Sequence, residues 1–242
     1  MPIMMTVNLI PAFSDNYIFI FPLNGGAIAV VDPGDAAPVI AHFDKTGQKP
    51  DYIFLTHHHD DHIGGAEQLR TKYGCKIIGH AADAKRLPAL DIAVNNGDQI
   101  NIDGTDINVI RTDGHTIGHI CYYMPAQETI FVGDTLFVMG CGRLFEGTAQ
   151  QMFESLQRIK SLPDATSIYC AHEYTLANAE FANAHLPENE EIKNALYFFN
   201  QLRADNIPTV PTTLRAEKLS NPFLIAESAE TFAEARTAKD NF

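Results

Sequence analysis

Short apolar runs separated by turn residues make up the first two thirds of the chain. Residues 17–21 and 27–31 are apolar runs separated by Asn24-Gly25-Gly26, a combination typical of a β-hairpin. Two helices are expected between later strands, over residues 36–45 and 66–73. The other expected strands cover residues 51–55, 76–79, 107–112, 119–124, 129–132 and 166–170. This order of elements predicts an α/β protein in which stacked sheets are faced by helices.

A helical pattern follows the strand-rich part. Thr148 and Gln151 form a capping box before apolar residues at helical spacing, which predicts a helix that buries one face. From residue 177 onward, strand patterns give way to apolar residues that recur at helical spacing. We therefore expect two domains. Residues 1–172 would form the strand-rich domain, and residues 173–242 a small helical domain.

The composition limits the kinds of partner. The chain has 242 residues, of which 45% are hydrophobic, so it can bury a core of ordinary size. Its formal net charge of −13 repels nucleic acid and anionic membranes, and neither is expected as a partner. No apolar run is long enough to cross a membrane, and the amino terminus lacks the basic and apolar regions of a secretory signal. These features predict a cytoplasmic protein, and we expect a monomer.

A dense cluster of metal-ligand residues follows one expected strand. Residues 57–62 read His-His-His-Asp-Asp-His and come directly after the apolar run 53–55. Imidazole and carboxylate groups are both good ligands for zinc and iron, so a bound divalent cation explains the cluster. A surface run or a purification tag is the alternative. A tag would lie at a terminus and would not be flanked by a strand and Gly64-Gly65.

The spacing within the cluster indicates two metal positions. His57 and His59 alternate along an extended segment, so both side chains can point to the same side. Asp61 and His62 are adjacent and are expected to point to a second position. The cluster would then supply half of each of two metal sites. The remaining ligands must come from distant loops, because local geometry cannot supply four ligands per metal.

Three distant residues end apolar runs where such ligands are expected. His115 follows the strand pattern that ends at Arg111, Asp134 follows residues 130–133, and His172 follows residues 168–171. Each alone is as easily a polar residue satisfied at a strand end. Together with the cluster, the three are candidate metal ligands.

These residues carry a resemblance to a known family. The motif Thr-His-x-His-x-Asp-His at residues 56–62, with three downstream ligands and Asp32 upstream, resembles the signature of the metallo-β-lactamase superfamily. Residues 140–148, residues 171–175 and Asn221-Pro-Phe223 are similar to the type II glyoxalases, the hydroxyacylglutathione hydrolases, in their bacterial form. This resemblance covers essentially the whole chain. It implies a four-layer αββα sandwich followed by a helical domain.

The resemblance also implies a role for each ligand. Two divalent metal ions are implied, zinc first, with iron or manganese as alternatives. Asp61 and Asp134 would be catalytic, and Asp32 would support the ligands from behind. Asp60 and Ile225 depart from the family pattern. The implied ligands are His57, His59 and His115 for one ion, Asp61, His62 and His172 for the other, and Asp134 as the bridge.

The implied reaction is the hydrolysis of S-lactoylglutathione to lactate and glutathione, the second step of methylglyoxal detoxification. A hydroxide activated by the two metal ions would attack the thioester carbonyl. A thioester suits this site because a thiol with a pKa of about 8.5 leaves readily as thiolate. The resemblance assigns glutathione recognition to Arg143, Tyr174, Arg236 and Lys239. Without the resemblance, the last two would be interpreted as solvated charges of a helix.

Three other functions fit parts of the pattern. A glutathione persulfide dioxygenase with one iron belongs to the same superfamily, and oxygen consumption would identify it. A metal-dependent RNA-processing hydrolase is disfavoured by the acidic charge, because RNA binding needs a basic surface. A non-catalytic, metal-stabilised binding module is disfavoured by seven complete ligand positions.

Overall fold

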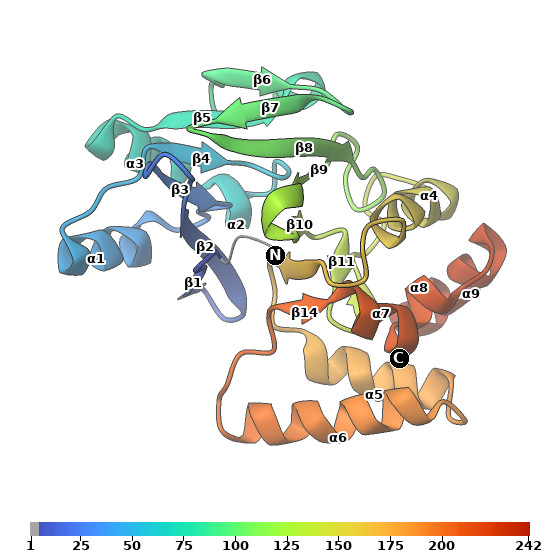
Figure 1. The fold of residues 1–242 in the computed structure, drawn as a ribbon. Coiled ribbons are helices and arrows are strands. Elements are labelled where there is room, and N and C mark those ends of the chain that lie inside the picture. Colours follow the sequence, from blue (N-terminus) through green and yellow to red (C-terminus); the bar gives the residue numbers. More distant parts are fainter. Residues whose placement is uncertain (1–4) are drawn as a thin grey trace. The chain divides into compact units, whose positions relative to one another are not determined.

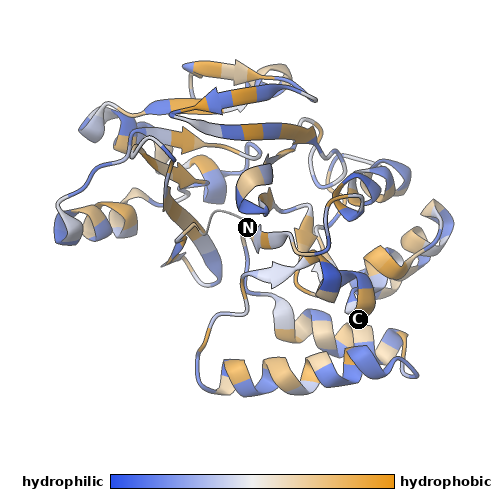
Figure 2. Ribbon diagram, viewed as in Figure 1, coloured by the Kyte–Doolittle hydropathy of each residue, from blue (hydrophilic) through white to orange (hydrophobic). Residues whose placement is uncertain are grey.

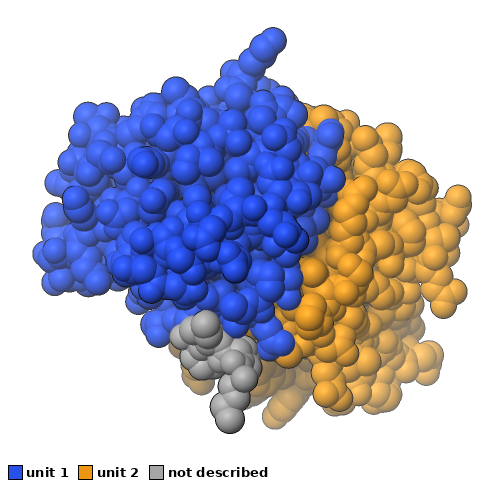
Figure 3. Space-filling view, turned by 45° about the horizontal axis from the view of Figure 1, so that its top comes forward, with its two compact units in different colours: residues 1–111, 118–133 blue, residues 112–117, 134–242 orange. Residues whose placement is uncertain are grey.

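The computed structural model describes residues 5–242 and contains two compact units, coloured separately in Figure 3. One unit consists of Met1–Arg111 and Gly118–Gly133, and the other of Thr112–Ile117 and Asp134–Phe242. The chain therefore passes between the units more than once. The expected domain boundary after residue 172 is not tested by this division and stays a prediction.

A six-stranded sheet forms the centre of the first unit (Figure 1). Its first three strands pair antiparallel, and its last four pair parallel, with β3 belonging to both sets. The parallel part places the carboxyl ends of β3 and β4 at one edge of the sheet, where loops can gather functional side chains. In sheet order, the strands are β1 (Asn8–Ala12), β2 (Asn16–Pro22), β3 (Ile28–Val31), β4 (Tyr52–Phe54), β5 (Lys76–His80) and β6 (Ile92–Val94).

Four further strands of the first unit form an antiparallel meander. They are β7 (Gln99–Ile102), β8 (Thr105–Arg111), β9 (Ile120–Met124) and β10 (Thr129–Gly133). The helices of this unit are α1 (Ala36–Thr46), α2 (Asp60–Ile63) and α3 (Ala66–Tyr73), and short 3-10 turns lie at Ala81–Asp83 and Pro125–Gln127. The unit therefore has the α/β composition that the sequence pattern predicts.

Strand β2 shows how the layers of the first unit are held together. Ile18 and Ile20, on one face, belong to a buried cluster that also contains the apolar residues of α1 and α3. Phe21, on the other face, stacks on Phe131 of β10 with ring centroids 4.8 Å apart. Each such side chain contributes about 2 kcal/mol by leaving water. Because successive side chains alternate between faces, β2 is apolar throughout and is covered on both sides.

The second unit contains most of the helices. Its α4 (Ala149–Lys160) begins with the predicted capping box, in which the Thr148 side chain accepts from the Gln151 amide. Helix α5 packs on α6, and α4 packs on α9. Figure 2 shows hydrophilic and hydrophobic residues alternating along these helices, as expected when one face is buried. The other elements are α5 (Thr175–His185), α6 (Glu190–Ala204), α7 (Leu214–Ser220), α8 (Pro222–Ile225), α9 (Ala229–Asp240), β11 (Leu136–Phe137), β12 (Gly140–Cys141), β13 (Ser167–Cys170) and β14 (Thr212–Thr213).

Some elements were not expected from the sequence. Strands β1 and β7 mix polar and apolar residues, so their apolar pattern is weak, and β6 has only three residues. Strands β11, β12 and β14 have two residues each, which is too short for any period to appear. Within the part of the chain that the structure describes, no helix is both long and apolar enough to span a membrane.

Candidate metal centre and cavity

The His/Asp cluster lies just beyond the carboxyl end of β4. The chain stays extended as far as His59, whose φ and ψ are −64° and 143°, and α2 then begins at Asp60. A Cβ atom at Gly34 would collide with the carbonyl oxygen of Asp61, so the β3 loop approaches the cluster only because residue 34 is glycine. This packing holds the start of α2 against the end of β3.

Asp32 organises the cluster through hydrogen bonds. Its Oδ1 accepts from the Thr56 amide at 2.8 Å, and its Oδ2 accepts from Thr56 Oγ1 at 2.6 Å. The same Oδ2 lies 3.0 Å from His62 Nδ1. An ionised carboxylate can only accept hydrogen bonds, so His62 donates from Nδ1 and carries its proton there. These contacts place Asp32 behind the two histidines, where the family resemblance implied a supporting residue.

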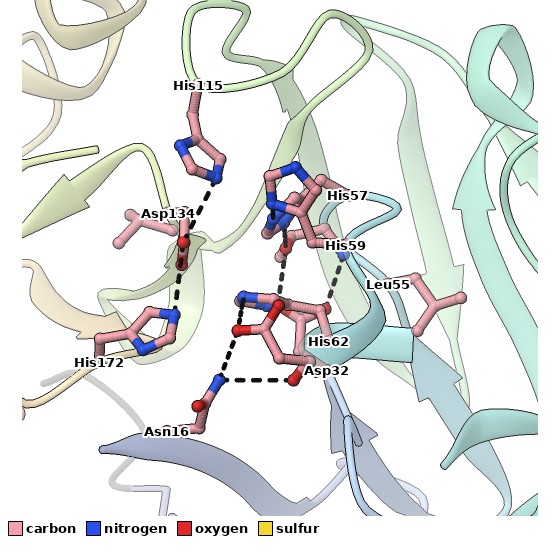
Figure 4. A network of polar contacts seen from close by, with 12 residues as sticks. Asn16, Asp32, Leu55, His57, His59, His62, His115, Asp134 and His172 are labelled. Atoms are coloured by element: carbon pink, nitrogen blue, oxygen red, sulfur yellow. Dashed lines mark hydrogen bonds and ion pairs between the residues drawn. The ribbon is translucent and has the colours of Figure 1, made fainter. Parts of the chain in front are cut away.

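The Asp32 bonds also determine the tautomer of His57. Because the Thr56 hydroxyl donates to Asp32, it accepts from His57 Nδ1, which lies 3.0 Å away. His57 Nε2 then carries a lone pair and lies 3.1 Å from His59 Nδ1. In the same way, the lone pair of His62 Nε2 faces Asp61 Oδ2 at 3.5 Å (Figure 4). The lone pairs of His62 Nε2 and Asp61 Oδ2 thus face one another, and a divalent cation fits between two ligand atoms placed in this way.

The remaining cluster residues differ in role. Asp61 is oriented by Asn16, whose side-chain amide donates to Asp61 Oδ2 at 2.9 Å. His58 contacts a residue outside the cluster, because its Nδ1 lies 3.2 Å from Asp83 Oδ2. Asp60 is exposed at the start of α2. In this unit, a group of Asp32, His57 and His62 has ligand atoms within 4.8 Å of one another.

The second unit brings three predicted ligands together. Asp134 Oδ2 lies 3.4 Å from His115 Nε2 and 3.4 Å from His172 Nε2, as the dashed lines in Figure 4 show. His115 Nδ1 donates to the Arg143 carbonyl at 2.9 Å, so its Nε2 keeps the lone pair that faces the carboxylate. One carboxylate oxygen is therefore shared between two imidazoles. All three side chains are buried, which excludes water as their main partner.

Backbone packing positions these three side chains. The His115 carbonyl accepts from the amides of Phe145 and Glu146, which fixes the loop after residue 111. A Cβ atom at Gly142 would collide with the Asp134 carbonyl, so this approach requires glycine. His172 follows β13, and its ring stacks on Tyr174 at 4.7 Å with 5° between the planes.

A cavity of about 700 Å³ lies in the second unit. His115 and Asp134 form part of its wall, so the cavity reaches the candidate metal ligands. The four residues expected to bind glutathione also line it, namely Arg143, Tyr174, Arg236 and Lys239. The structure thus brings predicted ligands and predicted substrate contacts to one cavity, although their roles stay predictions.

The two cationic side chains of α9, Arg236 and Lys239, are not simply solvated. Arg236 is 5% exposed, and its Nη1 donates to the Cys141 carbonyl at 2.9 Å. Lys239 Nζ donates to the Ala177 carbonyl at 2.7 Å, and burial lowers the pKa of Lys239. These contacts hold both cations at the cavity wall.

A buried clamp behind the cavity was not expected from the sequence. Glu217 of α7 accepts from the Met139 amide at 2.8 Å and from the Asn221 side chain at 2.9 Å. Asn221 also donates to the carbonyls of Phe137 and Gly140, at 3.1 and 3.0 Å. The clamp therefore holds the β11–β12 hairpin, which follows Asp134 directly. An acidic residue on a short helix carries no sequence signal for such a role.

Glu217 makes the stability of the protein depend on pH. Burial raises the pKa of its carboxyl from 4.5 to about 7, against the lowering effect of three hydrogen bonds. The folded state therefore holds a proton that the unfolded state releases between pH 4.5 and 7, and stability falls as pH rises through that range. Between pH 4.5 and 7, we expect the free energy of unfolding of the wild type to fall by about 3 kcal/mol relative to that of Glu217→Gln. Denaturant unfolding of both proteins at several pH values measures this difference.

Glu234→Gln provides the matched control for Glu217→Gln, because Glu234 is exposed on α9. The difference between its free energy of unfolding and that of the wild type should not change across the same pH range. The prediction is contradicted if the free energy of unfolding of the wild type, relative to that of Glu217→Gln, stays constant or rises between pH 4.5 and 7. That result would show that Glu217 is already ionised at the lower pH.

The sequence and the fold both match known proteins. Residues 10–172 match the metallo-beta-lactamase superfamily, and residues 173–242 match the hydroxyacylglutathione hydrolase C-terminus. The hydroxyacylglutathione hydrolase of Acidiphilium cryptum (strain JF-5) is 46% identical over 237 residues, which cover 98% of this chain and 97% of the relative. That of Pelagibacter ubique (strain HTCC1062) is 41% identical over 239 residues, which cover 98% of this chain and 100% of the relative.

The solved structures confirm the fold. The crystal structure of BLEG-1 B3 metallo-beta-lactamase has a TM-score of 0.69 and 22% identity, and the match covers 91% of this chain and 100% of that one. At this identity the match concerns the fold alone. The expected αββα metallo-β-lactamase fold with a helical C-terminal part is therefore confirmed, as is the expected family. The chain belongs to the metallo-β-lactamase superfamily and, within it, to the hydroxyacylglutathione hydrolases.

Proposed function

We propose that the protein hydrolyses S-lactoylglutathione to lactate and glutathione, the second step of methylglyoxal detoxification. The observation that carries this proposal is the cavity in which candidate metal ligands and candidate glutathione contacts share one wall. Similarity over nearly the whole chain to relatives named hydroxyacylglutathione hydrolase supports the same reaction. We also propose that the protein acts as a monomer in the cytoplasm, with no nucleic-acid or membrane partner.

The seven predicted ligands would hold two divalent cations, zinc in the first place and iron or manganese as alternatives. The close approach of the candidate ligand atoms within each unit supports this assignment. Asp134 would be shared, because its Oδ2 is equally distant from two imidazole nitrogens. The first ion would take His57, His59 and His115, the second Asp61, His62 and His172, and both Asp134.

When bound, two cations lower the pKa of a water to about 7 and stabilise negative charge on the thioester oxygen. Asp61, held by Asn16, would orient the attacking oxygen through a carboxylate oxygen. Asp32 would keep His57 and His62 in the tautomers that leave Nε2 free of a proton. The oxygen of water would form a bond to the thioester carbonyl carbon, and the carbon–sulfur bond would then break with its electron pair going to sulfur. The acyl group thus becomes lactate, and glutathione leaves as thiolate.

The cationic and aromatic side chains of the cavity would hold the glutathione portion. Arg236 and Lys239 are placed to bind a carboxylate, and Arg143 lies at the same wall. Tyr174, 40% exposed, offers a ring face and a hydroxyl to the thiol portion. We propose that residues 173–242 form the substrate-binding domain, because they supply three of these four contacts.

A hydrolysis assay combined with elemental analysis tests the proposal. We expect purified protein to contain two divalent ions per chain and to release thiol from S-lactoylglutathione, with loss of activity when a chelator removes the metal. Oxygen consumption with glutathione persulfide is the parallel measurement for a one-iron dioxygenase. Absence of thiol release from a metal-loaded sample would contradict the proposed reaction, and one ion per chain would contradict the two-metal assignment.

A further inference from the structure

The cavity wall contains an internal ion pair that the proposed reaction does not use. Asp240, the last residue of α9, places Oδ1 2.9 Å from Arg236 Nη2 and 3.7 Å from Arg143 Nε. All three residues line the cavity. One carboxylate oxygen therefore already lies between the guanidinium groups that the substrate carboxylate would need.

Arg236 keeps its position without Asp240. Its Nη1 is bonded to the Cys141 carbonyl at 2.9 Å, and its guanidinium lies 5.0 Å from the centroid of the Phe223 ring. The side chain is 6% exposed, so rotation to another position would require the wall to open. Asp240 is thus not needed to orient this arginine for a ligand.

Asp240 itself is weakly held. Its side chain is 43% exposed, and Arg143 is 67% exposed, so water screens much of their attraction. A carboxylate at the carboxyl end of a helix also meets the negative end of the helix dipole. An incoming carboxylate can therefore replace Asp240 at small cost, and Asp240 can return when that carboxylate leaves.

We propose that Asp240 is an internal competitor of the glycine carboxylate in the glutathione portion of the substrate. It neutralises the arginines in the free protein and limits affinity for any ligand that brings its own carboxylate. Because glutathione carries the same carboxylates as its thioester, the competition shortens the time that the thiol product stays bound. Asp240 thereby sets affinity and product release, and this inference rests on the proposed function.

Calorimetric titration with glutathione tests the competition without requiring turnover. We expect Asp240→Asn to lower the dissociation constant of glutathione about threefold to tenfold. The glycine ethyl ester of glutathione lacks the competing carboxylate, and its dissociation constant should change less than twofold. The Michaelis constant for S-lactoylglutathione should fall in parallel with the dissociation constant of free glutathione.

Glu234→Gln serves as the control, because it removes one negative charge from an exposed position of the same helix outside the cavity lining. Its dissociation constants should match those of the wild type. Weaker or unchanged glutathione binding by Asp240→Asn would overturn the inference, as would equal tightening for the ester. Failure of the wild type to hydrolyse S-lactoylglutathione would instead overturn the proposed function on which it rests.

Discussion

Replacement of Asp134 by alanine is expected to reduce turnover about 10³-fold and to lower the metal content of the purified protein. The physical reason is that one buried carboxylate oxygen lies 3.4 Å from both His115 Nε2 and His172 Nε2. Removal of this carboxylate takes away a charge that the proposed two ions would share. Steady-state thioester hydrolysis and elemental analysis of the same sample measure the two effects.

Asp106→Ala is a suitable control for Asp134→Ala, because Asp106 is an exposed carboxylate on β8. It should retain full activity and the full complement of metal. A variant at position 134 with nearly normal turnover and metal content would rule out the proposed two-metal scheme. Circular dichroism of the variant tells loss of the site apart from loss of the fold.

Asp32→Asn should weaken metal binding and catalysis about 10- to 100-fold without any change at a proposed ligand. The Asp32 carboxylate accepts from Thr56 and lies next to His62 Nδ1. An asparagine NH₂ group in the place of Oδ2 would instead donate a hydrogen bond. His62 would then accept at Nδ1 and carry its proton on Nε2, the nitrogen that faces Asp61. The wrong tautomer cannot bind a cation through Nε2.

The neighbouring Asp35→Asn variant controls for the loss of charge at Asp32. Asp35 caps α1, where asparagine serves as well as aspartate, and its side chain is partly exposed. Metal titration of both variants should therefore give wild-type affinity for Asp35→Asn and reduced affinity for Asp32→Asn. Equal affinities would mean that the Asp32 hydrogen bonds do not determine the His62 tautomer.

The strands and helices with strong patterns were predictable. Residues 66–73 were expected as a helix, and α3 spans Ala66–Tyr73. The capping box at Thr148 predicted the start of α4 because both of its hydrogen bonds are local. Strand β6 was missed, because its three apolar residues are too few to show a period and its place beside β5 depends on the fold.

The candidate site was predictable to the extent that its residues have a characteristic spacing. The cluster at residues 57–62 indicated metal binding directly, and His115, Asp134 and His172 became candidates because each ends an apolar run and the cluster needs further ligands. Asp240 and Glu217 had no such signal. Their roles depend on neighbours 97 and 78 residues away in the chain, Arg143 and Met139.

The sequence by itself determined the kind of chemistry that the protein can perform. The six residues at 57–62 already limit the site to imidazole and carboxylate ligands, and the apolar run before them places these ligands at a strand end. Ligand type and local spacing are properties of neighbouring residues, so no fold is needed to see them.

Only the tertiary structure decided which protons and charges face one another. Asp32 determines the tautomer of His62 directly and that of His57 through Thr56, and Asp240 meets Arg143 at the cavity wall. Electrostatic and hydrogen-bond energies depend on distances of a few ångströms, and long-range packing sets those distances. The spacing of residues along the chain identifies the candidate ligands, and packing determines the tautomers of His57 and His62 and the ion pairs of Asp240.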